Sequence, residues 1–232
     1  MTFDGAAGYL LLTVPDGLCI SIDHLHVTRD GVDILRDLSL HVACGERLII
    51  AGPNGAGKTT LLKTLLGLVP AAGGQVSILG TTVGSRAWSR GRRRVGYVHQ
   101  ESVSVDFPVS GREVVEIGAC TLRLGRAERR RRIDEAMSAA GCTHLAQRMY
   151  TRLSGGEKQK LSVARCLCQG PELLLLDEPT SSLDPGSRGE LMTLLRQLND
   201  TRALTVVMVS HDAEVLSWPG WRVLPMEAGA FA

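Results

Sequence analysis

The sequence predicts an α/β protein in which helices cover both faces of a largely parallel β-sheet. Two unbroken aliphatic runs, LLLLDEP at 173–179 and LTVVMVSHD at 204–212, are bounded by polar residues, as is typical of strands buried on both faces. A third segment, RLIIAGPNGAGKTTLLKTLLGL at 47–68, has the pattern of a short strand, a glycine-rich turn and a helix with leucines at helical spacing. Such strands alternating with helices favour a parallel sheet.

An antiparallel β layer is expected ahead of this core. Residues 18–27 alternate between apolar and polar side chains, and a turn at Asp30 and Gly31 leads into a second strand. Between Gln100 and Ser154 the pattern becomes helical and rich in arginine, which predicts a small helical lobe. The expected boundaries are 18–232 for a single domain, about 18–100 and 155–232 for its core lobe, about 101–154 for its helical lobe and 1–17 for an amino-terminal extension.

Composition excludes several classes of protein. Of the 232 residues, 44% are hydrophobic and 22% are charged, which favours a globular chain over a disordered one. The longest uncharged apolar stretches, at 9–14 and 173–176, are far shorter than the roughly 20 residues that span a bilayer. The first basic residue is Arg29, so the start of the chain lacks the positive charge of a secretory signal. We therefore expect a cytoplasmic protein.

The charged and sulfur-containing residues suggest no separate binding function. A net charge of +2 is far from the basic excess of a dedicated nucleic-acid-binding protein, so we expect no nucleic-acid partner. Eleven of the 22 arginines lie in two clusters, which we interpret as solvated faces with counter-charges nearby: Arg86, Arg90 and 92–94, then Arg123, Arg126 and 129–132. The six cysteines have no metal-ligand spacing and are expected to be buried, reduced thiols.

The glycine-rich turn matches the phosphate-binding pattern GxxxxGK[ST] in full and lies between a strand and a helix, as its mechanism requires. Its residues and the next one are Gly52, Pro53, Asn54, Gly55, Ala56, Gly57, Lys58, Thr59 and Thr60. Glycines let the backbone N–H groups point at the oxygens of a triphosphate, and the helix dipole adds positive charge there. Lys58 would bridge the outer phosphates, Thr59 would offer a hydroxyl to Mg²⁺, and Thr60 would contact the inner phosphates. The alternative is a turn that only caps the helix.

Two carboxylates follow the strand-like run at 173–176. Asp177 stands where an open parallel sheet binds its ligands, so it can hold Mg²⁺ opposite the phosphate loop. Glu178 points elsewhere and can orient or deprotonate an attacking water. Alone, the pair could simply end a strand, but together with the phosphate loop it predicts a nucleotide-hydrolysing site.

A second phosphate-facing element is predicted at LSGGE. Ser154 and Glu157 have the spacing of a capping box at the start of a helix. The capping box leaves Gly155 and Gly156 unexplained, and their exposed backbone N–H groups at a helix start suit an anion.

In order, the segments GPNGAGKTT, LSGGEKQKLSVARCL, LLLLDEPTSSLD and VSHD resemble the nucleotide-binding subunits of ATP-binding cassette (ABC) proteins. The resemblance covers about residues 18–223, and LSGGE ahead of the DEP strand is specific to that family. It implies a P-loop NTPase fold of ABC type, with a RecA-like parallel-sheet core, an antiparallel β subdomain and a helical subdomain. It also implies that two subunits pack head to tail, so that Ser154, Gly155 and Gly156 of one chain cover the γ-phosphate held by the Lys58 loop of the other.

The same resemblance assigns further residues. Gln100 resembles the glutamine that senses Mg²⁺ and water where the helical lobe hinges, His211 the histidine that contacts the γ-phosphate, and 181–184 the loop between the two sites. An aromatic residue that usually stacks on adenine is replaced by Arg29, whose guanidinium plane can also stack on a base. If Arg29 does not stack, adenine would be held loosely.

The resemblance implies an ATPase with ATP and Mg²⁺ as cofactors, attached to the inner face of the membrane through a separate permease, with a substrate-binding protein as a further partner of an importer. The segment at 101–118 resembles those of zinc, manganese and iron-chelate importer cassettes, which favours a metal cargo. Alternatives are an export cassette, a soluble ATPase such as the iron–sulfur assembly type, and a degenerate module that binds ATP without cleaving it. Only 53 residues separate Gln100 from Ser154, too few for the coiled coils of DNA-repair members.

Overall fold

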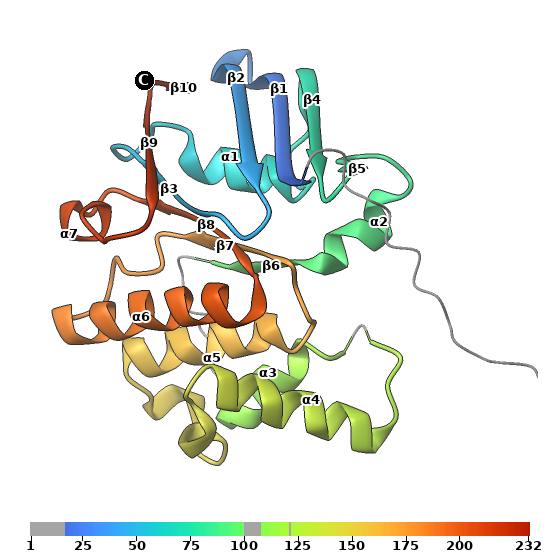
Figure 1. The fold of residues 1–232 in the computed structure, drawn as a ribbon, viewed down its shortest axis with the longest axis vertical. Helices are drawn as coiled ribbons and strands as arrows, with labels where there is room; N and C mark the ends of the chain where they lie inside the picture. Colours follow the sequence, from blue (N-terminus) through green and yellow to red (C-terminus); the bar gives the residue numbers. More distant parts are fainter. Residues whose placement is uncertain (1–16, 100–107, 121) are drawn as a thin grey trace, which may run out of the picture.

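The computed structural model describes residues 17–99, 108–120 and 122–232. Its strands form a six-stranded sheet in the order β10-β9-β3-β8-β7-β6 and a four-stranded sheet in the order β2-β1-β4-β5 (Figure 1). The strands are β1 (Leu18–Arg29), β2 (Val32–Ala43), β3 (Arg47–Ala51), β4 (Gly73–Ile78), β5 (Thr81–Thr82), β6 (Val95–Val98), β7 (Leu173–Asp177), β8 (Thr205–Ser210), β9 (Arg222–Glu227) and β10 (Ala230–Phe231). The α-helices are α1 (Lys58–Leu65), α2 (Trp88–Gly91), α3 (Gly111–Ile117), α4 (Arg126–Ala139), α5 (Gly155–Leu167), α6 (Pro185–Arg202) and α7 (Ala213–Leu216).

The six-stranded sheet confirms the parallel core. Strand β3 pairs in parallel with β8 and β9, and β7 pairs in parallel with β6 and β8, while only the edge strand β10 is antiparallel. Every residue of β7 and β8 is buried, which is why their aliphatic runs are unbroken. The carboxyl ends of β3, β7 and β8 therefore meet at one edge of the sheet, where the predicted site residues follow each strand.

The four-stranded sheet confirms the antiparallel layer. β1 and β2 pair from Leu18 opposite Ala43 to Arg29 opposite Val32. The two residues that join them, Asp30 and Gly31, both have positive φ, at 50° and 77°. Such a turn matches the twist of the strands it connects, and Asp-Gly is a sequence suited to it.

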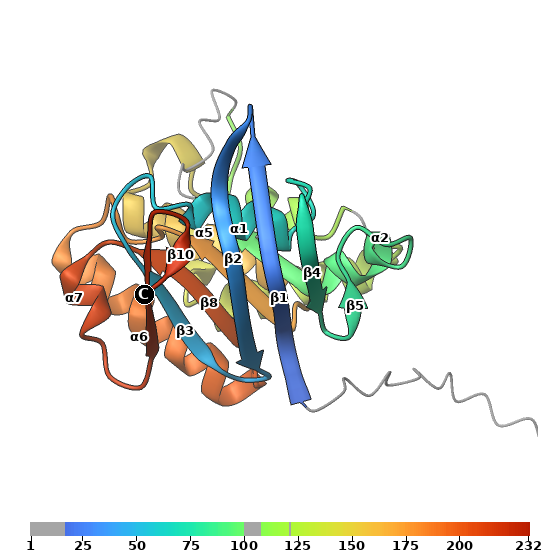
Figure 2. The ribbon, with the colours of Figure 1, turned by 90° about the horizontal axis from the view of Figure 1, so that it is seen from above.

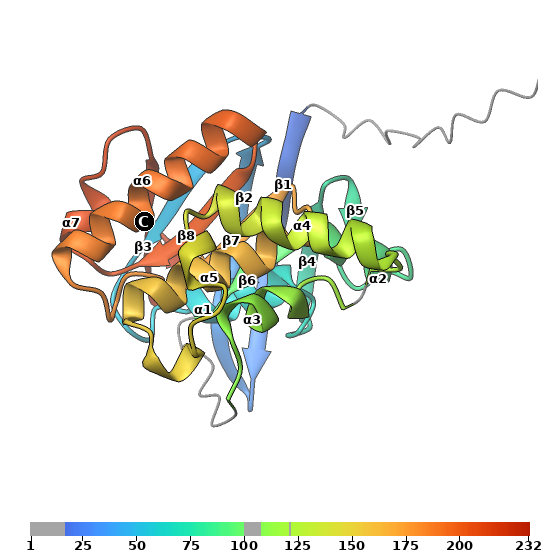
Figure 3. The ribbon, with the colours of Figure 1, turned by 90° about the horizontal axis from the view of Figure 1, so that it is seen from below.

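The two faces of the central sheet are covered differently, which corrects one expectation. One face is covered by helices alone: α5 and α6 pack on it, with α3 and α4 beyond α5 (Figures 1 and 3). On the other face lie α1 and the antiparallel sheet, which Figure 2 shows from above. The antiparallel layer was predicted, but its position as the second cover of the core could not be derived, because β1 and β2 bury only one side of their alternating pattern.

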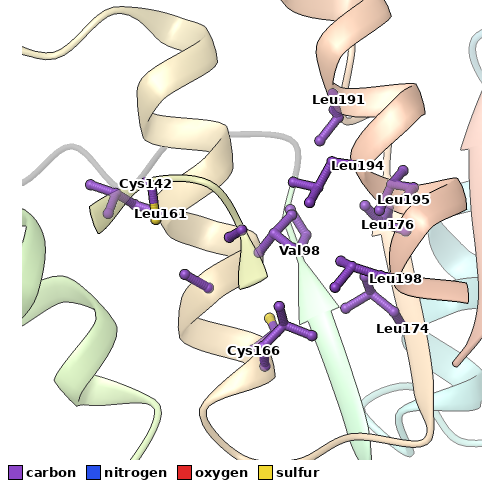
Figure 4. Close-up of a cluster of buried hydrophobic side chains, with 14 of the residues drawn as sticks. Val98, Cys142, Leu161, Cys166, Leu174, Leu176, Leu191, Leu194, Leu195 and Leu198 are labelled. Atoms are coloured by element: carbon purple, nitrogen blue, oxygen red, sulfur yellow. The ribbon is translucent and has the colours of Figure 1, made fainter. Parts of the chain in front are cut away.

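The predicted helical lobe is present and is joined to the core through α5. Helix α5 contacts α3 and α4 as well as β6 and α6. Figure 4 shows the buried side chains along this junction: Leu161 of α5 lies beside Cys142, and Val98 lies between α5 and the leucines of β7 and α6. The boundary expected at residue 154 falls where α5 begins, but one hydrophobic cluster continues across it.

Three smaller expectations are confirmed in part. Of the leucines at helical spacing after the phosphate loop, Leu61, Leu62 and Leu65 are fully buried in α1. The helix ends at Leu65, and Leu68 lies beyond it and is 63% exposed. All six cysteines are free thiols, but Cys44 and Cys120 are exposed. The other four are buried, and burial raises the pKa of the Cys19 and Cys142 thiols to about 12.

The two arginine clusters differ in their surroundings. In the second cluster, the guanidinium groups of residues 129–132 lie within ion-pair distance of Glu116, Glu128, Asp134 and Glu135, as expected for a solvated face with counter-charges. In the first cluster, Arg94 pairs with Glu172. Six exposed arginines form no ion pair with any residue that the structure describes, so they are solvated as expected but lack close counter-charges: Arg86, Arg90, Arg92 and Arg93 of the first cluster, and Arg123 and Arg126 of the second.

The junction between α3 and α5 yields a stability prediction. A Cβ on Gly118, which ends α3, would lie 2.0 Å from the Arg165 carbonyl oxygen of α5, so the Gly118→Ala variant must push the two helices apart. We expect a loss of about 1–3 kcal/mol in the free energy of unfolding, because overpacking costs that much. Gly189→Ala is the matched control: in α6 its Cβ would meet nothing closer than 3.7 Å, and alanine favours a helix.

Denaturant unfolding of both variants measures this difference. Equal stability of Gly118→Ala and the wild type would contradict the close approach of α3 to α5.

Candidate functional site

The phosphate loop connects a strand to a helix as predicted, and two of its positions require glycine, one for its backbone conformation and one for a close approach. Residues 52–57 connect β3 to α1, and Gly57 has a φ of +100°, which favours glycine. A Cβ on Gly52 would lie 2.1 Å from the carbonyl oxygen of Met226, on β9. The loop and the start of α1 open into a cavity of about 430 Å³, lined by Ile34, Asn54, Gly55, Gly57, Lys58, Thr59, Thr60 and Glu178.

Lys58 lies inside the loop rather than in solvent. Its side chain is 5% exposed, and its ammonium donates hydrogen bonds to the carbonyl oxygens of Gly52 (2.7 Å) and Pro53 (2.9 Å). The Lys58 Nζ atom also lies 3.5 Å from Glu178 Oε1. A cation held this way beside a helix N-terminus concentrates positive charge where the outer phosphates of a nucleotide are expected.

Thr59 and Asp177, which were predicted to hold Mg²⁺, are hydrogen-bonded to each other. The Thr59 hydroxyl donates a hydrogen bond to Asp177 Oδ1 at 2.9 Å, across the boundary between α1 and the end of β7. A hydroxyl and a carboxylate are hard oxygen donors, the kind of ligand that Mg²⁺ prefers. No cluster of three or more His, Cys, Asp or Glu side chains exists in the described parts of the chain, so phosphate oxygens and water would complete the shell.

Tyr97 is a site residue that sequence reasoning missed. It lies on β6, and its hydroxyl donates a hydrogen bond to Asp177 Oδ2 at 3.1 Å, so both carboxylate oxygens of Asp177 are held in place. Burial and the negative charge of Asp177 raise the pKa of Tyr97, which keeps the phenol protonated as a donor. Its position three residues before Gln100 placed it near a predicted site residue in the sequence. Only the parallel pairing of β6 with β7, however, brings Tyr97 to Asp177.

Glu178 and His211, predicted separately from the sequence, lie in contact with each other. Glu178 Oε2 lies 2.9 Å from His211 Nδ1, while Glu178 Oε1 faces Lys58, so the carboxylate stands between the phosphate cavity and the histidine. Glu178 is 8% exposed and has a φ of +45°, an unusual conformation for a residue with a side chain. Its N–H donates to the Val209 carbonyl oxygen, which ties it to β8. Strained backbone of this kind is concentrated at functional sites.

The start of α5 has the predicted capping box. The Ser154 hydroxyl accepts a hydrogen bond from the Glu157 N–H, and the Glu157 carboxylate accepts one from the Ser154 N–H. The backbone N–H of Ser154 and the neighbouring Arg148 lower the pKa of Glu157. Ser154 and Gly155 are exposed, and neither they nor Gly156 lines the phosphate cavity of their own chain.

The structure also gives Gly156 a packing role that the sequence did not reveal. A Cβ there would lie 2.7 Å from the Ser187 hydroxyl oxygen in the first turn of α6. A Cβ on Gly155 would lie 3.4 Å from a methyl carbon of Leu183. The two glycines therefore let the segment after Glu178 approach α5 closely, besides exposing their backbone.

The structure does not place two of the predicted residues at the site. Gln100 lies outside the described residues. Arg29 is 83% exposed, 3.8 Å from the Asp30 carboxylate, and is not among the residues that line the phosphate cavity, whereas Ile34 of β2 is. Adenine stacking by Arg29 stays a prediction.

A phosphate loop, a hydrogen-bonded threonine–aspartate pair and a glutamate beside a histidine, at the carboxyl edge of a parallel sheet, define a P-loop nucleotide-binding protein. The sequence profile of the ABC transporter family matches residues 35–181. The chain belongs to this family, and it is an ATP-binding cassette with ATPase activity.

Similar proteins carry this identification further. The manganese transport system ATP-binding protein MntB of Bacillus subtilis is 39% identical over 201 residues, which cover 84% of this chain and 78% of MntB. CbiO1 of Clostridium perfringens, part of the ABC transporter complex CbiONQ, has a structure with a TM-score of 0.86 at 28% identity, over 94% of this chain and 88% of CbiO1. The dimeric cassette MJ0796, bound to ADP and phosphate, has a TM-score of 0.79 at 28% identity, over 91% and 96% of the two chains.

Removal of the Tyr97 hydroxyl tests its hold on Asp177. In Tyr97→Phe, one oxygen of a buried carboxylate loses its donor, which costs about 1 kcal/mol or more in placing that ligand. We expect the Mg²⁺ concentration for half-maximal ATPase activity to rise roughly fivefold, the equivalent of about 1 kcal/mol. Nucleotide binding without Mg²⁺, followed by a fluorescent ATP analogue, should not change.

Tyr150→Phe is the matched control, because Tyr150 is a buried tyrosine in the helical lobe and no hydrogen bond joins it to the described site residues. An unchanged Mg²⁺ requirement in Tyr97→Phe would mean that Asp177 does not need this donor.

Proposed function

We propose that two copies of this chain pack head to tail and hydrolyse ATP at shared sites, each made of the phosphate cavity of one chain and the start of α5 of the other. The observation that carries this proposal is the separation of the two phosphate-facing elements: Ser154 and Gly155 are exposed, yet they do not line the cavity beside Lys58 in their own chain. The existence of MJ0796 as a dimer with ADP and phosphate bound supports it.

Within such a site, each residue has a defined task. Lys58 binds the β- and γ-phosphates, and Thr59 and Asp177 hold Mg²⁺, which neutralises the negative charge that develops on the phosphates. Glu178 orients the attacking water, because it is next to the phosphate cavity and its carboxylate need not bind the metal. His211 contacts the γ-phosphate from the other side of Glu178. Ser154, Gly155 and Gly156 of the second chain complete the binding of the γ-phosphate through their backbone.

We further propose that the closing and opening of the dimer drives import through a separate permease, with metal ions or metal chelates as the cargo. No helix in the described part of the chain is long and apolar enough to span a bilayer, so the motion must be passed to another subunit. The name of MntB, a manganese transport protein, and the membership of CbiO1 in the CbiONQ transporter complex support a permease and a metal cargo. The cassette would then lie on the inner face of the membrane.

The catalytic part of the proposal is tested by Glu178→Gln. The amide keeps the size of the side chain but cannot accept a proton, so we expect turnover to fall by at least about 100-fold, as is typical for loss of a general base. Because ATP then stays bound, the variant should form a dimer in Mg-ATP that size-exclusion chromatography with light scattering detects.

The matched control is Glu190→Gln, which removes a surface carboxylate that pairs with Lys160. It should hydrolyse ATP like the wild type. Wild-type turnover in Glu178→Gln would remove Glu178 from catalysis, and a strictly monomeric trapped variant would contradict the shared site.

The transport part is tested by isolating the tagged Glu178→Gln protein with native membranes in Mg-ATP and identifying the membrane protein that comes with it. A permease is expected, and vesicles containing both proteins should take up Mn²⁺ or a related metal only when ATP is present on the cassette side. An export permease, or the absence of any membrane partner, would contradict this part without affecting the ATPase mechanism.

A further inference from the structure

Arg188, in the first turn of α6, connects three segments through one guanidinium group. Its side chain is 17% exposed. Its Nη1 atom lies 3.1 Å from Asp212 Oδ2 and also contacts the carboxylate of Glu214, and its Nη2 atom donates a hydrogen bond of 3.4 Å to the carbonyl oxygen of Leu183. A planar, rigid guanidinium can hold several acceptors in fixed relative positions, which a flexible ammonium cannot.

These three contacts fall on the segments that follow the two catalytic candidates. Leu183 belongs to the turn after Glu178, in which the Ser181 N–H donates to the Glu178 carbonyl oxygen and the Leu183 N–H donates to that of Thr180. Asp212 directly follows His211. One side chain therefore holds the segment after Glu178 and the segment after His211 at a fixed separation.

The segment around His211 is held mainly by Asp212. The Asp212 N–H donates to the Ser210 hydroxyl, and Asp212 Oδ1 accepts the Glu214 N–H at the start of α7, so Oδ2 remains for Arg188. The imidazole of His211 is 46% exposed, and its close polar contact is Glu178 Oε2. Because little else surrounds the ring, its position depends on the backbone on either side of it.

We propose that Arg188 is a positioning residue for His211: it holds the Ser210–Asp212 segment against the turn after Glu178, so that the imidazole reaches the γ-phosphate. This inference rests on the role proposed above for His211. The same turn of α6 carries Ser187, against which Gly156 packs, so α6 joins the start of α5 to the histidine segment. Arg188 itself touches no residue that lines the phosphate cavity through the contacts described.

The test compares Arg188→Gln and Arg188→Lys with Arg47→Gln as the matched control. Arg47 is 20% exposed, pairs with Asp200 at 3.6 Å and, like Arg188, has one buried guanidinium nitrogen without a hydrogen-bond partner among the described residues. It lies at the start of β3, at the opposite end of that strand from the phosphate loop. We expect Arg188→Gln to lower kcat at least about tenfold with KM for ATP changed less than about twofold, because positioning affects the transition state more than ground-state binding.

Arg188→Lys should fall between wild type and Arg188→Gln, and Arg47→Gln should keep the wild-type kcat. The decisive measurement adds Arg188→Gln to His211→Ala. If Arg188 acts through His211, the double variant has the kcat of His211→Ala alone, because the two changes remove one function. A further tenfold loss in the double variant, or a wild-type kcat in Arg188→Gln, would overturn the proposal.

Failures of the two proposals can be told apart. If His211→Ala itself keeps the wild-type kcat, the role proposed for the histidine fails. If only Arg188→Gln keeps it, the positioning role fails and the histidine role stands. Should Arg188→Gln not fold, as judged by its melting temperature, Asp212→Asn gives the same comparison: it removes the charge that Arg188 binds but keeps the size and the cap of α7.

Discussion

The site depends on one buried cation, the Lys58 ammonium, and on the groups that compensate its charge. The Lys58 ammonium is almost wholly removed from water, and two loop carbonyls with the nearby Glu178 carboxylate take the place of that water. Removing one partner from a buried ion pair typically costs about 3–5 kcal/mol, because the remaining charge stays uncompensated. The glycine-rich loop, the end of β7 and the start of α1 must therefore meet where they do. Phosphate oxygens are chemically suited to replace these contacts, which would free Glu178 to act on water.

The parts of the fold that could be predicted from the sequence are those determined by local patterns. The strands β7 and β8 and the Asp-Gly turn between β1 and β2 are determined by short stretches of sequence, and all were predicted correctly. The phosphate loop and the capping box at Ser154 are also local patterns and were correct. The cover of the second face of the core was predicted only in part: α1 lies there as expected, but the antiparallel sheet packs beside it, and a half-buried strand pattern does not say which layer it will pack against.

What the sequence could not supply are contacts between residues far apart in the chain. Tyr97 reaches Asp177 only because β6 pairs with β7, and Arg188 reaches Asp212 only because α6 begins near the loop after β8. Neither residue belongs to a motif with a known spacing. The pairing of Glu178 with His211 was likewise not predicted, since the two are 33 positions apart and nothing in their spacing predicts a contact. The four unpaired arginines near α2 also depend on tertiary placement, which determines whether a carboxylate lies within reach.

The position of α6 gives the proposed dimer a physical consequence. In a head-to-tail pair, the start of α5, with Gly155 and Gly156, would face the nucleotide bound by the partner chain. His211 would face the nucleotide bound by its own chain. Within one chain, Gly156 packs on Ser187, and the next residue, Arg188, holds Asp212 beside His211. The path from one site to the other is therefore only a few side chains long and passes through a single helical turn. Because that turn contacts α5 through Ser187 and Asp212 through Arg188, we expect a shift of α5 toward a nucleotide to move the histidine segment as well.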